Sequence, residues 1–82
     1  HGSSPLQLGL ASLPLISPAE AHRALSAHLE ALLAQREHLI QRRDEQRPLP
    51  PHVEAMFAHS LALLDAESDW LRDFIAAYDE QE

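Results

Sequence analysis

The sequence contains no cysteine and almost no glycine. Without cysteine, its 82 residues cannot form disulfide frameworks, catalytic thiols or cysteine-based zinc sites. The two glycines, Gly2 and Gly9, are too few for the glycine-rich loops that hold nucleotide phosphates. Aromatic residues make up only 5% of the chain, and they lie in its C-terminal third: Phe57, Trp70, Phe74 and Tyr78.

Positive charge and long apolar runs are also scarce. Six Lys and Arg residues stand against thirteen Asp and Glu residues, which gives a net charge of −7. Because nucleic-acid affinity depends on cationic contacts to phosphate, we expect this chain alone to bind DNA and RNA poorly. No run approaches the ~18 apolar residues of a membrane span, so we expect no membrane association and a cytoplasmic location.

The remaining composition is that of a small folded domain. Apolar residues make up 45% of the chain, which is enough for a core. A chain of this size buries only about 60% of its unfolded surface, so a second copy would add much stability. Residues 1–4, HGSS, resemble the remnant of an affinity tag. We therefore expect one domain over residues 5–82, excised from a longer protein.

The segment 17–47 predicts a long amphipathic helix. Ser17, Pro18 and Glu20 have the spacing of a capping box with proline at the first helical position. Leucines then recur at intervals of three and four, and Arg36 and Arg43 occupy the open steps of this pattern. The apolar positions are Leu25, Leu29, Leu32 and Leu39, widened by Leu33 and Ile40. The helix would be roughly 45 Å long at ~1.5 Å per residue.

The segments on either side of this helix are rich in proline. Residues 5–16 predict a short helix near 5–13, limited by Gly9 and Pro14; a buried strand is the alternative, although no second strand exists to pair with it. Pro48, Pro50 and Pro51 end the long helix in a rigid turn. Arg42, Arg43 and Arg47 precede this turn. We favour helix-end electrostatics and pairing with Asp44 and Glu45 for them over an anion-binding patch.

Residues 52–79 predict a second long helix with two apolar stripes. The wider stripe comprises Val53, Phe57, Leu61, Leu64, Leu71, Phe74, Ile75 and Tyr78. The second comprises Met56, Leu63 and Trp70, at intervals of seven. A helix that is apolar over more than half its circumference must be covered on more than one side. One side fits the first long helix, and the other predicts a second copy of the chain.

Residues able to carry chemistry do not form a catalytic or metal-binding pattern. Beyond the tag, no two histidines lie three or four residues apart, so we expect His22, His28, His38, His52 and His59 to be structural or exposed. Asp65, Glu67, Asp69 and Asp73 fit a solvated acidic face better than acid–base catalysis. We expect no enzyme activity, cofactor or metal.

Trp70 is the remaining candidate for a binding residue. A lone helical tryptophan most often packs in a core or interface. The alternative is an apolar wall for a small aromatic ligand, lined by Met56, Leu63, Trp70 and Phe74.

The order of elements resembles the C-terminal domain of PadR-family bacterial transcriptional regulators, in the branch with the longer, virulence-activator-type domain. The resemblance covers residues 5–78: PLQLGLASLPLIS, then PAEAHRALSAHLEALLAQREHL, a proline break, and a helix containing LALLDAESDWLRDFI. The most specific match is AESDWL at residues 66–71, similar to the family's A-E-x-x-W-L.

The resemblance implies a dimerisation domain that follows an N-terminal, DNA-binding winged helix-turn-helix, often with ligand sensing. No basic recognition helix precedes Pro5, which fits an excised part and puts in doubt any effector site shared with the missing half.

We therefore predict an all-α domain of three helices, near 5–13, 18–47 and 52–79, that forms a helical homodimer. Its function would be to position two DNA-binding domains; a stand-alone helical protein-interaction module is the alternative. We predict core or interface positions at Leu25, Leu29, Leu32, Leu63, Leu64, Trp70, Leu71 and Phe74. Which stripe faces the partner stays open.

Overall fold

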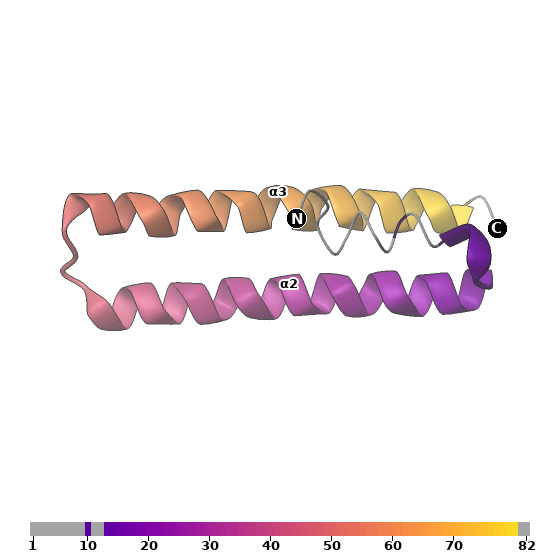
Figure 1. Cartoon of the computed structure of the whole chain (residues 1–82), viewed down its shortest axis with the longest axis horizontal. Coiled ribbons are helices and arrows are strands. Elements are labelled where there is room, and N and C mark those ends of the chain that lie inside the picture. Colours follow the sequence, from indigo (N-terminus) through magenta and orange to yellow (C-terminus); the bar gives the residue numbers. More distant parts are fainter. Residues whose placement is uncertain (1–9, 11–12, 81–82) are drawn as a thin grey trace.

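The computed structural model describes residue 10 and residues 13–80. Its elements are a short 3₁₀ turn η1 (Leu13–Leu15) and two long helices, α2 (Pro18–Gln46) and α3 (Pro51–Glu80). Figure 1 shows α2 and α3 running antiparallel and side by side, joined at one end by the proline turn. The described residues contain no strand. The predicted pair of long helices is thus confirmed, with bounds within one residue of those expected.

The third predicted helix, near 5–13, lies almost entirely outside the described residues. Leu10 is described, and its side chain packs with Leu13 against the core. The described part of the chain is therefore mainly a two-helix hairpin, formed by α2 and α3.

Helix α2 begins at the capping box that the sequence predicts. The backbone N–H of Glu20 donates to Ser17 Oγ at 3.1 Å, and the N–H of Ser17 donates to Glu20 Oε1 at 3.4 Å. These two bonds satisfy backbone donors that the first helical turn leaves unpaired, and they fix where the helix begins.

The proline turn sets the start of α3. The carbonyl oxygen of Pro50 accepts hydrogen bonds from the backbone N–H groups of Val53 and Glu54, both at 3.0 Å. Pro51 occupies the first position of α3, where its missing N–H costs no hydrogen bond. The turn therefore ends one helix and starts the next within a few residues.

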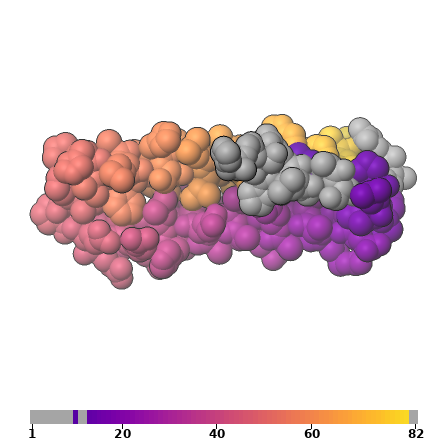
Figure 2. All heavy atoms as spheres, viewed as in Figure 1, coloured from indigo at the N-terminus to yellow at the C-terminus, as the bar shows by residue number. Residues whose placement is uncertain are grey.

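The core is narrow and lies along the seam between the helices. Its buried side chains are Leu25 and Leu32 of α2 and Leu71 of α3, flanked by partly buried Leu29, Leu64, Phe74 and Ile75. Figure 2 shows the side chains of α2 and α3 meeting in the half of the hairpin next to the proline turn. Since two helices can bury only one stripe of each, the opposite faces of both stay exposed.

Candidate interaction surface

A row of large apolar side chains lies exposed on α3. Met56, Leu63 and Trp70 keep 65%, 59% and 48% of their surface accessible. Seven residues make almost two helical turns, so the three side chains lie on one face of α3. We call this row the α3 stripe. It is the second apolar stripe that the sequence predicts, and α2 does not cover it.

Trp70 connects the α3 stripe to the core, because it stacks on Phe74. Its ring stacks on that of Phe74, with centroids 5.1 Å apart and planes 9° from parallel. Phe74 packs against the core and contacts the ring of Tyr78 at 5.9 Å. Such a stack restricts the indole ring, so that Trp70 presents a preformed apolar surface.

The predicted core and interface residues divide into two groups. Leu25, Leu32 and Leu71 are buried, and Leu29, Leu64 and Phe74 are partly buried against them. Leu63 and Trp70 are exposed. The first six residues therefore belong to the seam within the chain, whereas the last two belong to the α3 stripe.

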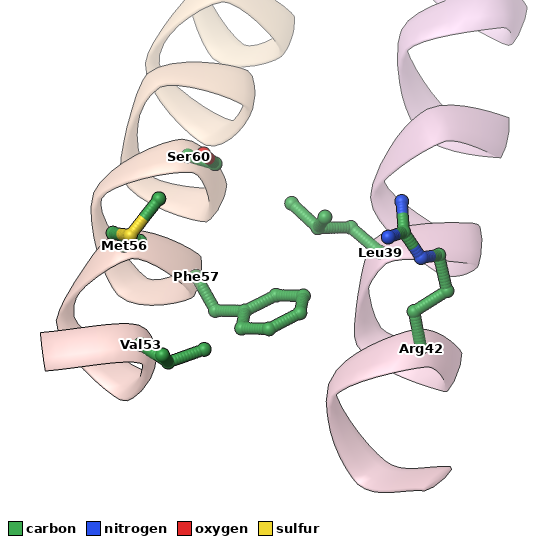
Figure 3. A pocket seen from close by; sticks show the side chains of 6 residues that line it. All are labelled: Leu39, Arg42, Val53, Met56, Phe57 and Ser60. Atoms are coloured by element: carbon green, nitrogen blue, oxygen red, sulfur yellow. The ribbon is translucent and has the colours of Figure 1, made fainter. Parts of the chain in front are cut away.

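The residues predicted to line a ligand pocket do not together line the hollow beside the proline turn. An open hollow of about 160 Å³ lies near the proline turn, and Met56 is the only one of the four that lines it. Figure 3 shows the Phe57 ring pointing from α3 towards α2, across from Leu39, with the Arg42 guanidinium at the edge. Leu63, Trp70 and Phe74 lie farther along α3, so the hollow is not the predicted aromatic pocket.

Hydrogen-bonded pairs of side chains connect the two helices along the hairpin. Arg36 Nε lies 2.5 Å from Asp65 Oδ1, and His28 Nε2 lies 3.2 Å from Glu67 Oε2. At the open end, His22 Nδ1 lies 2.9 Å from Asp79 Oδ1. These pairs were not predicted from the sequence, because they depend on the register between the helices. The interpretation of a wholly solvated acidic face fits Asp69 and Asp73 but not Asp65 and Glu67.

A two-pronged ion pair closes the proline turn. Arg47 Nε and Nη2 donate to the two carboxylate oxygens of Glu54, at 2.8 and 3.0 Å. The hydrogen bond from Arg47 lowers the pKa of Glu54 below its ordinary value, and the same bond raises the pKa of Arg47. Asp44 accepts from Arg43 at 3.1 Å, as the sequence predicts for these helix-end arginines.

The described residues offer no grouping suited to metal binding. Across residue 10 and residues 13–80, no three His, Asp or Glu side chains converge. None of the described helices is long and apolar enough to cross a membrane.

Comparison with known proteins does not place the chain in a family. No protein-family model, curated protein or solved structure matches it. The α3 stripe is therefore the feature from which function must be argued.

Proposed function

We propose that this chain is a self-association module, a helical hairpin that pairs with a second copy through α3. The observation that carries the proposal is the exposure of Met56, Leu63 and Trp70 at heptad spacing. Heptad-spaced apolar residues are the pattern by which one helix packs along another. The α3 stripe lies beside the face of α3 that packs on α2, where a further helix can cover it.

The energetics support association. Complete burial of a side chain the size of leucine or methionine is worth roughly 1.5–3 kcal/mol. A two-fold interface buries each residue of the α3 stripe twice, once in each copy. Trp70 adds a large, restricted aromatic surface, which is the kind of residue that dominates interface energies.

The wider proposal is that two such hairpins position the DNA-binding domains of a PadR-like regulator in the cytoplasm. Its support is the sequence resemblance over residues 5–78, together with the proposed pairing. Dimer geometry sets the spacing of DNA half-sites, so a rigid hairpin pair suits this task. The net charge of −7 means that the DNA contacts would come from outside this domain.

The test of self-association is the molar mass in solution, measured by light scattering over a wide concentration range. We expect a dimer for the natural sequence and a monomer for Leu63→Glu, with unchanged helical content by circular dichroism. Leu15→Glu is the matched control, because Leu15 is 83% exposed and lies in η1, away from the α3 stripe. A folded chain that stays monomeric at all concentrations would refute the proposal.

A chain that stays monomeric would favour the alternative, a module that binds a helix of another protein through the α3 stripe.

Binding of a small aromatic effector is a separate proposal. Titration of Trp70 fluorescence with phenolic ligands tests it, and a saturable change that is lost in Met56→Ala is the supporting result. The regulator proposal is tested on the full-length protein, whose DNA binding should require an intact α3 stripe.

A further inference from the structure

We infer that the partner copy packs its α3 antiparallel to this α3, with the two-fold axis at Leu63. In this arrangement Leu63 contacts the partner's Leu63, and Trp70 lies against the partner's Met56. The inference rests on the proposed self-association and adds its direction, register and contacts.

The spacing of the α3 stripe fixes the register. Leu63 lies seven residues from Met56 and seven from Trp70, so it is the midpoint of the row. A two-fold axis through the midpoint brings every residue of the stripe against one in the partner copy. Any other register would leave at least one large apolar side chain of each copy without a partner. The midpoint alone fits both a parallel and an antiparallel pair.

Charge decides between these two directions. The half of the hairpin away from the proline turn carries eight carboxylates against three arginines. Its acidic residues are Glu20, Glu30, Asp65, Glu67, Asp69, Asp73, Asp79 and Glu80, and its arginines are Arg23, Arg36 and Arg72. The half next to the turn, residues 37–64, carries four carboxylates against three arginines and also contains three histidines.

A parallel pair would place the two acidic halves side by side. Packed helices lie about 8–10 Å apart, within the ~8–10 Å over which charges interact at physiological salt. An antiparallel pair places each acidic half beside the nearly neutral half of its partner. It also aligns the dipoles of the two α3 helices in opposite directions, which is the favourable arrangement.

One pair of positions beside the α3 stripe agrees with this direction. Symmetry about Leu63 sets His59 opposite the partner's Glu67, since both lie four residues from the axis. A parallel pair would instead set Glu67 beside the partner's Glu67, which brings two negative charges together. The antiparallel direction sets no carboxylate of Pro51–Glu80 opposite another carboxylate.

The contact between Trp70 and the partner's Met56 is a favourable pairing of side chains. Thioether sulfur packs favourably against aromatic rings, and the flexible methionine side chain adapts to the indole surface. Because Trp70 stacks on Phe74, its ring is already oriented before the partner arrives. A parallel pair would replace these two mixed contacts with a Met–Met and a Trp–Trp contact.

Cysteine cross-linking tests the direction, since these 82 residues contain no cysteine to interfere. We would oxidise Leu63→Cys alone, Met56→Cys alone, and a mixture of Met56→Cys with a mass-tagged Trp70→Cys. We expect Leu63→Cys to cross-link to itself, and the mixture to give at least about tenfold more mixed disulfide than Met56→Cys gives homodimer, because disulfides require Cβ atoms about 4 Å apart. A predominant Met56→Cys homodimer would show a parallel pair and overturn the inference.

Cysteine at Met56, Leu63 or Trp70 removes an apolar side chain from the proposed interface. A second pair of variants therefore leaves these three side chains in place. His59→Cys mixed with Glu67→Cys probes the same direction at polar positions. Light scattering under reducing conditions establishes first whether each variant is a dimer. Dimers that form no cross-link at positions 56, 59, 63, 67 or 70 would overturn the inference while self-association stands. The absence of any dimer, including for the natural sequence, would instead refute the proposed function, and with it this inference.

Discussion

Arg47 and Glu54 form an ion pair across the proline turn, with two hydrogen bonds of 2.8 and 3.0 Å. One residue ends α2 and the other lies in the first turn of α3, so the pair holds the two helices at the angle of the hairpin. Planar guanidinium and carboxylate groups fit each other in this two-pronged geometry. The pair fixes where the hairpin closes.

The Arg47–Glu54 pair predicts a loss of stability in acid. The folded-state pKa of Glu54 lies below its ordinary value of 4.5, because Arg47 donates a hydrogen bond to the ionised form. The stabilisation is therefore complete at neutral pH and is lost as the pH falls below that value through the folded-state pKa. Glu54→Gln should lower the urea midpoint of unfolding at neutral pH. Its difference from the natural sequence should shrink in acid, at equal protein concentration. An equal difference at both pH values would contradict the assignment.

We expect truncation of Leu71 to lower stability more than truncation of any other single side chain. Leu71 is fully buried at the seam between α2 and α3. Leu71→Ala removes apolar contacts and leaves a cavity, so we expect a loss of about 2–5 kcal/mol in the free energy of unfolding. Urea unfolding followed by circular dichroism measures this loss. Leu33→Ala is the control, because Leu33 is 40% exposed, and it should cost far less. Comparable losses for the two variants would show that the core lies elsewhere.

Helix ends and apolar stripes could be predicted from the sequence because their causes are local. The capping box at Ser17 and Glu20, and the prolines at 48, 50 and 51, act through neighbouring residues. The two stripes of α3 follow from helical periodicity alone.

Contacts between the helices could not be predicted in the same way. Whether Asp65 meets Arg36 depends on the length of the turn and on the rotation of each helix about its axis. The same rotation buries Leu71 and leaves its neighbour Trp70 exposed. Periodicity gives the order of residues around a helix but not which of them turns towards the other helix.

The capping box predicts a second local effect on stability. Ser17 Oγ accepts from the backbone N–H of Glu20, so Ser17→Ala leaves that donor unpaired. We expect a loss of about 0.5–2 kcal/mol. Amide hydrogen exchange at Glu20 should also become faster, while exchange in the first turn of α3 stays unchanged. Ser17→Asp is the control, because aspartate also caps helices, and it should retain most of the stability. Unchanged exchange at Glu20 in Ser17→Ala would mean that another group caps α2.

We expect substitution of Ser68 by alanine to stabilise the fold. Ser68 is buried on α3, with 3% of its surface accessible, and its hydroxyl has no hydrogen-bond partner among the described residues. Leaving a polar group buried and unpaired costs about 1–3 kcal/mol, and alanine is also the better helix former. Ser68→Ala should therefore raise the free energy of unfolding by about 1 kcal/mol or more.

The matched control for Ser68 is Ser60→Ala, because Ser60 lies on the same helix with its side chain exposed. That variant gains helix propensity alone, so its stabilisation should be smaller, about 0.5 kcal/mol. The difference between the two variants isolates the cost of burying the hydroxyl. Urea unfolding of both at one protein concentration measures it. A loss of stability in Ser68→Ala would show that the hydroxyl forms a hydrogen bond in solution, and that its burial is not a cost to the fold.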